Sequence, residues 1–171
     1  MSVTVRPATK TDVPAGATVL ADAFFDDPVM AWMWPDEGRR EHGLRRYFAA
    51  EARFHSVPVG GADIAERDEI VGGAALWGPP VHGSRRYGSR FACGPGSRSH
   101  SAVTRAPESP SAQHSRPFIP PNRTATHAPA YLEPSKEVNI GYYERFGFEV
   151  TREIVIPRGG PTLWAMWRNP R

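Results

Sequence analysis

Two adjacent tyrosines, Tyr142 and Tyr143, are the residues of this sequence best suited to handle a proton. They lie in the stretch NIGYYERFGFEV, about one helical turn before Gly147. A phenol has an ordinary pKa of about 10, so it stays protonated at neutral pH and can donate when a stronger base develops nearby. The alternative is that both rings only fill a core.

Helical spacing separates the two tyrosines. One stripe is apolar and is predicted to face the core; it consists of Val138, Tyr142 and Phe146. Packing alone is therefore a sufficient explanation for Tyr142. Tyr143 shares a second stripe with Asn139 and Ser135, whose polar side chains are an unusual lining for a core. Tyr143 is accordingly the candidate for chemistry, and the remaining alternative is that its hydroxyl merely binds a backbone carbonyl.

The pair lies in a well-patterned block, residues 130–171, which begins with the short strand AYLE. The helix that follows is predicted to end at Gly147, because glycine readily adopts the left-handed conformation that closes helices, and Phe148 can pack back on the last turn. The segments FEVTREIVIP and TLWAMWR then predict two strands joined through RGGP.

A second patterned block covers residues 1–80. VTVRPA predicts a strand and DVPAGATVLADAFF a helix, and a further helix is predicted over residues 37–54 with Leu44, Phe48 and Ala52 on its buried side. ADIAER and IVGGAALWGPP predict a hairpin that turns at the dipeptide DE. The residues of the second helix predicted to face water are Arg39, Arg40, Arg45 and Glu51. The two blocks together predict a single mixed α/β domain.

The middle of the chain, residues 81–129, has a different composition. It contains seven arginines, one acidic residue (Glu108), no lysine, no leucine and no methionine, among many Ser, Pro and Gly. Such a segment buries too little apolar area to offset the roughly 1 to 2 kcal/mol per residue that ordering a backbone costs. We expect a disordered or loosely attached insert. Nucleic-acid binding by its arginines is disfavoured, because its three aromatic residues are not interleaved regularly with them.

Composition limits the remaining classes of protein. A chain of 171 residues suits one domain with a real core, and no stretch approaches the roughly 18 to 20 apolar residues of a membrane span. Cys93 is the only cysteine, which excludes an internal disulfide or a cysteine-based metal site. We expect a cytoplasmic protein without a metal; its oligomeric state cannot be read from the sequence.

The segment LEPSKEVNIGYYERFGFEV, residues 132–150, resembles the carboxyl-terminal motif of the GNAT superfamily of acetyltransferases, closest to the subgroup containing puromycin N-acetyltransferase. The amino-terminal VRPATKTDVPAGATVLADAFFDDPV and the final GGPTLWAMWRNP are similar to the same subgroup, in the same order. The resemblance implies a mixed central sheet flanked by helices, and transfer of an acetyl group from acetyl-CoA to the primary amine of a small molecule.

The resemblance also implies roles for particular residues. The amine attacks the thioester directly, and the tyrosine that protonates the departing thiolate corresponds to Tyr143. Asn139 and Ser135 fall at positions that would contact acetyl-CoA, where Asn139 would hydrogen-bond the pantetheine arm or brace the helix. In such enzymes the segment FFDDPVMAWMWPD walls the acceptor pocket, and Glu133 is a candidate general base by position. The residues expected at the acceptor are Phe25, Asp27, Trp32, Trp34 and Glu133; an equally good interpretation of the two tryptophans is packing beneath the second helix.

The pyrophosphate-binding turn that such enzymes require is not recognisable. A glycine-rich turn at a helix N-terminus offers backbone N–H groups to the phosphates. The nearest imitation, CGPGSRSH at residues 93–100, contains Pro95, which lacks an N–H group. We therefore predict that the central strand and the following helix are disrupted within residues 81–129 and that acetyl-CoA binds weakly. Our hypothesis is that the DNA for this segment is read out of frame; the alternative to an enzyme is an inactive GNAT remnant.

Overall fold

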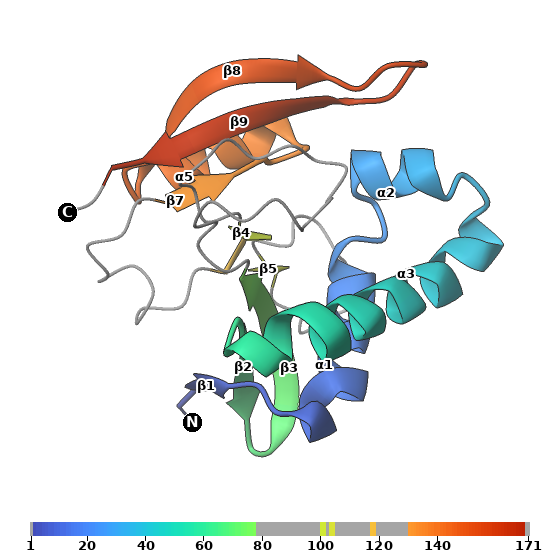
Figure 1. Cartoon of the computed structure of the whole chain (residues 1–171), viewed down its shortest axis with the longest axis vertical. Helices are drawn as coiled ribbons and strands as arrows, with labels where there is room; N and C mark the ends of the chain where they lie inside the picture. The colour runs from blue at the N-terminus through green and yellow to red at the C-terminus, as the bar shows by residue number, and fades with distance from the viewer. Residues whose placement is uncertain (1, 78–99, 102, 105–116, 119–129, 170–171) are drawn as a thin grey trace.

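The computed structural model describes residues 2–77, 100–101, 103–104, 117–118 and 130–169. Their strands form two main sheets (Figure 1). The first sheet has the order β1-β2-β3-β4 and is antiparallel throughout; its strands are β1 (Thr4–Pro7), β2 (Ala62–Arg67), β3 (Ile70–Trp77) and β4 (His100–Ser101). The second has the order β7-β9-β8 and is also antiparallel; its strands are β7 (Ala130–Leu132), β8 (Glu149–Val155) and β9 (Thr162–Arg168). Together with the helices they give the mixed α/β fold that the sequence predicts.

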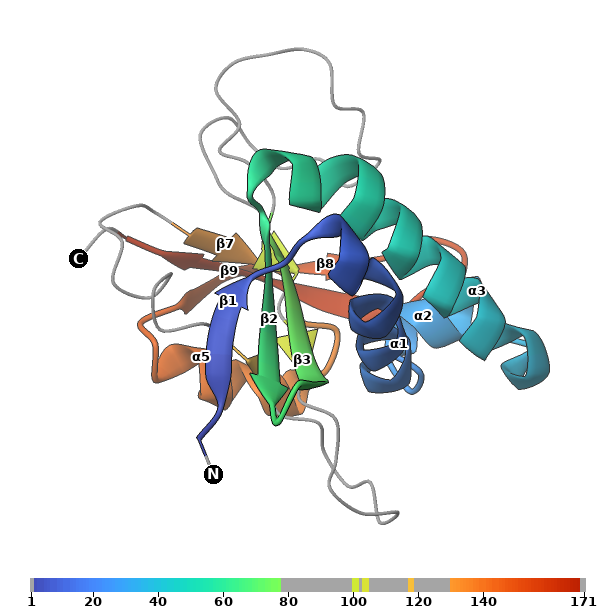
Figure 2. The same ribbon diagram turned by 90° about the horizontal axis from the view of Figure 1, so that it is seen from below.

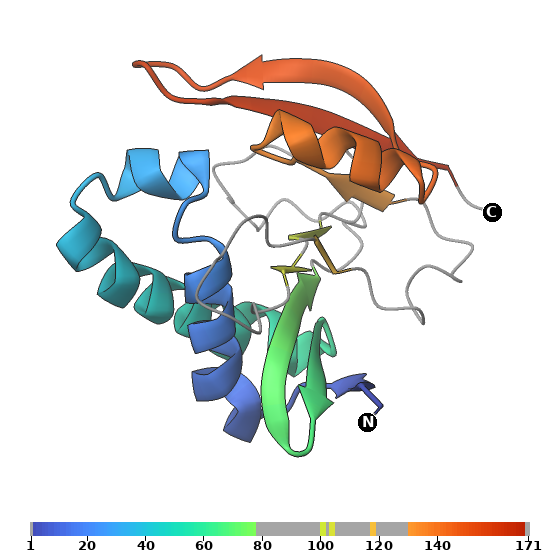
Figure 3. The same cartoon turned by 180° about the vertical axis from the view of Figure 1, so that it is seen from behind.

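Three helices follow β1 and one precedes β8. The longer elements are α1 (Val13–Ala23), α2 (Pro28–Met33), α3 (Glu37–Glu51) and α5 (Ile140–Glu144). Single turns adjoin them: η1 (Lys10–Asp12), η2 (Ala52–Ser56), η3 (Val57–Val59) and η4 (Glu137–Asn139). Figure 2 shows α1 and α3 lying together beside the strands of the first sheet, and Figure 3 shows α5 beneath the β8–β9 hairpin.

The first core lies between α1, α3 and strands β2 and β3. Leu20, Leu44 and Ile64 are at most 2 % exposed. Phe48 and Ala52 complete the buried stripe predicted for the helix over residues 37–54, which is α3 and the turn η2 that continues it. Fully burying one such aliphatic side chain contributes roughly 1.5 to 3 kcal/mol. This cluster therefore joins α1 and α3 to the first sheet in the amino-terminal half of the molecule.

A second, smaller core lies under the β7-β9-β8 sheet. Leu132 of β7, Met166 of β9 and Phe148 are at most 3 % exposed, and Tyr143 of α5 packs among them. The chain thus has one core on the acceptor side of the predicted site and another around the tyrosine.

Both predicted hairpins are present. Strands β2 and β3 are joined at Asp68 and Glu69, whose φ angles of 50° and 66° are those of a tight turn with two left-handed residues. Strands β8 and β9 are joined by a turn in which Arg158 and Gly159 also have positive φ. These elements were predictable because their alternating patterns and turn residues are local in the sequence.

Little of the arginine-rich middle segment is described. Within residues 81–129 the structure places β4, which pairs with the end of β3, and an antiparallel pair formed by β5 (Val103–Thr104) and β6 (Pro117–Phe118). The predictions of disorder, of a disrupted central strand and helix, and of a faulty pyrophosphate turn at residues 93–100 otherwise lie outside the described residues.

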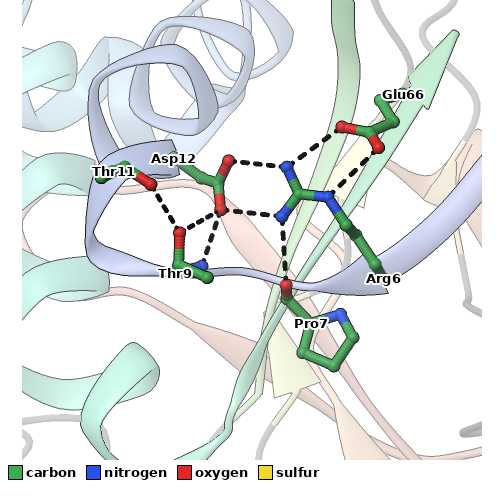
Figure 4. Close-up of polar contacts among 6 residues, drawn as sticks. All are labelled: Arg6, Pro7, Thr9, Thr11, Asp12 and Glu66. Carbon is green, nitrogen blue, oxygen red and sulfur yellow. Dashed lines mark hydrogen bonds and ion pairs between the residues drawn. The ribbon is translucent and has the colours of Figure 1, made fainter. Parts of the chain in front are cut away.

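An ion network ties β1 to the first helical turn and to β2 (Figure 4). The guanidinium of Arg6 donates to both carboxylate oxygens of Asp12 at 2.9 Å and to both of Glu66 at 3.1 Å. Asp12 in turn accepts from the backbone N–H of Thr9 at 2.7 Å and from its hydroxyl at 2.6 Å. One arginine therefore connects three elements of the amino-terminal half, β1, η1 and β2.

Candidate functional site

Tyr143 lies on the inner face of α5. Its side chain is 4 % exposed and contacts Tyr142 and Phe148 edge to face, with ring centroids 5.5 and 6.0 Å apart. Tyr142 is only half-buried, and Val138 is 66 % exposed. The predicted assignment of helix faces was therefore wrong for Val138, which is exposed, and for Tyr143, which lies in the buried core where Tyr142 was expected. The segment starts as a short 3-10 turn, η4, so the four-residue spacing does not hold from position 138.

The end of α5 fixes the direction of the tyrosine ring. The backbone N–H of Phe148 donates to the carbonyl of Tyr143 at 3.3 Å, and that of Gly147 donates to the carbonyl of Glu144 at 2.9 Å. With Gly147 at φ 81°, these are the two bonds of a Schellman ending, as predicted. Phe148 then packs on the Tyr143 ring, so the cap and the core restrain the same side chain.

The surroundings of Tyr143 keep its hydroxyl protonated. Burial raises the pKa of the phenol well above its ordinary value of about 10, and the neighbouring Tyr142 phenol and the Asp27 carboxylate raise it further. The hydroxyl makes no hydrogen bond to another residue that the structure describes. It is thus a neutral donor across the physiological range, and within the described part of the chain its proton is uncommitted.

Asp27 reaches this region from the opposite half of the molecule. It is 8 % exposed, and one carboxylate oxygen caps α2 by accepting from the N–H groups of Val29 at 2.9 Å and Met30 at 3.1 Å. The other oxygen accepts a hydrogen bond from the hydroxyl of Ser135. The structure therefore brings Asp27, Ser135 and Tyr143, three of the predicted site residues, into one region.

Asn139 and Glu133 flank this group. Asn139 is half-buried and ends η4, and its backbone N–H donates to the carbonyl of Lys136 at 3.0 Å. Glu133 follows β7, is half-buried, and accepts a hydrogen bond from the hydroxyl of Tyr131. Their assignment to acetyl-CoA and to the acceptor remains a prediction.

Of the two tryptophans predicted to line the acceptor pocket, one is exposed and the other packs against a helix. Trp32 on α2 is 42 % exposed. Trp34 packs against α3, with its ring 5.9 Å from that of Tyr47, and a Cβ added at Gly43 would come within 2.9 Å of its indole nitrogen. Gly43 is thus what lets the indole approach the helix. Trp34 therefore packs on α3, whereas the side chain of Trp32 remains exposed.

A buried arginine organises the same segment. Arg40 is 6 % exposed, and its guanidinium donates to the carbonyls of Trp34, Phe25 and Pro35 at 2.7, 3.1 and 3.3 Å. It also lies 5.1 Å from the centroid of the Phe25 ring. The prediction that Arg40 faces water was wrong. Its position four residues before Leu44 places it on the buried stripe of α3, a periodicity that could have revealed it.

The described residues contain neither a cluster of metal-binding side chains nor a helix that could span a membrane. No group of three or more histidine, cysteine, aspartate or glutamate side chains is arranged to hold a metal ion there. None of the helices in these ranges has the length and apolarity needed to cross a membrane.

Several solved structures with this architecture are described as acetyltransferases. A structure described as histone acetyltransferase HPA2 and related acetyltransferase from Corynebacterium glutamicum is 28 % identical, covers 100 % of this chain and 98 % of its own, and superposes with a TM-score of 0.75. The chain has the GNAT acetyltransferase fold. No protein-family model matches the sequence.

Two more distant structures share the GNAT fold. The polyamine N-acetyltransferase of Drosophila melanogaster is 13 % identical over 98 % of this chain and 100 % of its own, with a TM-score of 0.58. The yncA protein of Salmonella typhimurium, solved with its cofactor acetyl-CoA, is 16 % identical over 98 % of this chain and 93 % of its own, with a TM-score of 0.52. By resemblance, then, the GNAT fold of this chain is that of an acyl-CoA N-acyltransferase.

Proposed function

We propose that the chain transfers an acetyl group from acetyl-CoA to a primary amine of a small molecule, with Tyr143 as the proton donor. One observation carries the proposal. At the position of the tyrosine in the GNAT motif, the GNAT fold of this chain holds a buried, neutral phenol beside a carboxylate from the predicted acceptor segment. The resemblance to the puromycin-modifying subgroup remains part of this proposal.

The proposed reaction needs no covalent enzyme intermediate. The lone pair of the neutral amine attacks the carbonyl carbon of the thioester, and the carbon–sulfur bond breaks with both electrons going to sulfur. Tyr143 gives its proton to the sulfur, and the nitrogen loses one proton in turn, for which Glu133 is the candidate acceptor. Because its pKa is raised, Tyr143 is protonated at neutral pH, so it can donate a proton in this step but cannot serve as a base there.

Acetyl-CoA supplies the activated acetyl group. The phenol of Tyr143 is neutral, and the polar side chains of Ser135 and Asn139 are half-buried in the segment that leads into α5, which suits the reactive end of such a molecule. The phosphates would require backbone N–H groups from another part of the chain, and residues 93–99 lie outside the described ranges. We propose Asn139 as a contact to the pantetheine arm; the hydroxyl of Ser135, the other residue expected there, is already bound to Asp27.

The acceptor is proposed to be a small amine. Neighbouring structures include enzymes named for polyamines and agmatine, which are amines of this kind. In this chain the exposed indole of Trp32 and the ring of Phe25 offer flat apolar contact area, which suits an acceptor with an apolar portion next to its amino group. Neither a membrane nor a nucleic acid is part of the proposed reaction.

The test is calorimetry with acetyl-CoA, followed by assays of acetyl transfer to agmatine, spermidine and tyramine. Tyr143→Phe should reduce kcat by roughly 100-fold or more, because general acid catalysis contributes about that much. Tyr142→Phe is the matched control and should change kcat less than about threefold. Equal activity of wild type and Tyr143→Phe would remove the assigned role of the phenol.

An inactive remnant of the GNAT fold is the second candidate. The observation that favours it is Pro95 in the only glycine-rich stretch near the expected phosphate turn. This candidate predicts no thermal stabilisation by micromolar acetyl-CoA and no acetylation of any amine. Clear stabilisation at micromolar acetyl-CoA contradicts it, and the nucleotide sequence tests its proposed origin directly: if neither alternative reading frame encodes an apolar strand and a glycine-rich turn, the frameshift hypothesis is wrong.

A further inference from the structure

Two consecutive residues of one half of the molecule bind two consecutive residues of the other. Asp26 and Asp27 lie in the turn between α1 and α2, whereas Ser135 and Lys136 lie between β7 and η4. The hydroxyl of Ser135 donates to the carboxylate of Asp27, and the ammonium of Lys136 lies 2.8 Å from a carboxylate oxygen of Asp26. We call these four residues the clasp.

The buried half of the clasp, Asp27 and Ser135, is held rigidly because Asp27 also caps α2. One carboxylate oxygen of Asp27 accepts from two N–H groups at the start of α2, so the side chain is fixed to that helix while its other oxygen binds Ser135. The Ser135 hydroxyl is thus held at a fixed place relative to α2.

The outer half of the clasp is more open. Side-chain exposure is 75 % for Asp26 and 31 % for Lys136, so their ion pair is screened by water. It resembles in strength the ion pair of Glu41 and Arg45, 2.7 Å apart within α3. The difference is that the Asp26–Lys136 pair joins the two halves of the molecule, whereas the α3 pair joins residues of one helix.

The clasp joins the two segments whose relative position matters most for the proposed reaction. The turn of Asp26 and Asp27 begins the predicted acceptor segment, and Ser135 and Lys136 lead into the helix of Tyr143. Transfer requires the amine, the thioester and the phenol to meet within about 3 to 3.5 Å, and a displacement of about 1 Å can cost 100-fold in rate. A contact that sets the spacing of these two segments therefore affects the rate without touching the reacting atoms.

We propose that the clasp positions the helix of Tyr143 against the acceptor segment, so that Asp27, Ser135, Asp26 and Lys136 are positioning residues. This inference rests on the proposed function for its catalytic consequence. The clasp does not bring the amine to the site by charge, because Ser135 and Lys136 occupy both acidic side chains.

Steady-state kinetics on the full chain test the proposal. Ser135→Ala should lower kcat by roughly 10- to 100-fold while changing KM for acetyl-CoA less than about threefold, and Ser135→Thr, which keeps the hydroxyl, should restore most of the rate. Lys136→Met and Asp26→Asn should each lower kcat by a similar, smaller factor, and the double variant should lose no more than either single variant. Arg45→Met, which breaks the pair within α3, should leave kcat unchanged.

Two kinetic outcomes overturn the proposal. If Ser135→Ala raises KM for acetyl-CoA at unchanged kcat, Ser135 is a contact of the co-substrate and not a positioning residue. If Asp26→Asn raises KM for the amine while Lys136→Met has no effect, Asp26 attracts the substrate by its charge.

A spectroscopic readout separates this inference from the proposed function. The ultraviolet absorbance of tyrosine reports ionisation of the phenols, and subtraction of a Tyr143→Phe background isolates Tyr143. Both Asp27→Asn and Ser135→Ala should lower the pKa of Tyr143, by removing or loosening the nearby carboxylate, whereas Asp26→Asn should not change it. If the wild type transfers no acetyl group, the proposed function fails, and an unaltered Tyr143 titration in Ser135→Ala then overturns the clasp as well.

Discussion

The guanidinium of Arg40 donates a 2.7 Å hydrogen bond to the carbonyl oxygen of Trp34, six residues earlier in the chain. The same group reaches the carbonyls of Phe25 and Pro35, so one side chain of α3 fixes the path of the chain before and after α2. A loop carries backbone carbonyls that need partners when they are buried, and Arg40 supplies these from a rigid helix. The predicted acceptor segment is thereby held by α3 as well as by the clasp.

Arg40→Met should lower the free energy of unfolding by about 2 to 4 kcal/mol. The methionine keeps the apolar stem but leaves the three partly buried carbonyls without this donor. Chemical denaturation at neutral pH measures the loss as a shift of the midpoint at an unchanged slope. Arg40→Lys should recover only part of it, because a lysine ammonium cannot spread its donors as the planar guanidinium does.

Arg39→Met provides the matched control for Arg40→Met. The neighbouring side chain is 87 % exposed and forms only a surface ion pair with Asp36, 3.4 Å away. Its removal should change the free energy of unfolding by less than about 0.5 kcal/mol. Similar losses in the two variants would show that the carbonyl contacts of Arg40 contribute little to stability.

Local patterns predicted most of the regular structure. The β2–β3 turn at Asp68 and Glu69 and the helix ending at Gly147 follow from residue types within a few positions of each other. The buried stripe of Leu44, Phe48 and Ala52 follows from helical periodicity alone. In each case the residues that determine the structure lie within one turn, one helix or one hairpin of the sequence.

Contacts between distant residues could not be predicted in this way. The bond between Ser135 and Asp27 spans 108 positions, and no local pattern signals it. The burial of Tyr143 in place of Val138 depends on the 3-10 turn before α5, which shifts the helical phase. Fold class was therefore accessible from sequence, whereas the partners of Tyr143 required the three-dimensional arrangement.

Asp12→Asn should remove an acid-sensitive part of the stability. The Arg6 guanidinium, followed by hydrogen bonds from Thr9, lowers the pKa of Asp12 far below its ordinary value of about 4. A lowered pKa in the folded state contributes stability that is present above about pH 4 and is lost as the pH falls through the folded-state value. The variant should thus be less stable than wild type at pH 7, with the difference shrinking below about pH 4.

Denaturation curves between pH 7 and pH 2 measure this difference directly. Glu41→Gln, at an exposed carboxylate paired with Arg45 within one helix, serves as the control and should differ little from wild type at any pH. A stability gap between wild type and Asp12→Asn that stays constant down to pH 2 would contradict the assigned role of the ionised carboxylate.

Two glycines of the α5 segment should respond oppositely to alanine. Gly147 has φ 81°, where a Cβ costs about 1 to 2 kcal/mol, so Gly147→Ala should destabilise the protein by that amount. Gly141 is an exposed residue of α5 whose added Cβ would meet only Glu144 at 4.0 Å, so Gly141→Ala should stabilise by up to about 1 kcal/mol. Thermal unfolding of the two variants compares them, and equal shifts of Tm would show that the Schellman ending is not strained by a side chain.

Tyr143→Phe should make the protein more resistant to alkali. In the unfolded chain the phenol ionises near its ordinary pKa of about 10, whereas burial keeps it protonated in the folded protein at that pH. The unfolded state therefore loses a proton that the folded state retains, and the free energy of unfolding should fall as the pH rises above about 10. Denaturation at pH 8 and pH 11 should show a smaller loss for Tyr143→Phe than for wild type, while Tyr142→Phe, at a half-buried position, serves as the control. If wild type and Tyr143→Phe lose the same stability, the phenol ionises freely in the folded protein and its burial does not hold the proton.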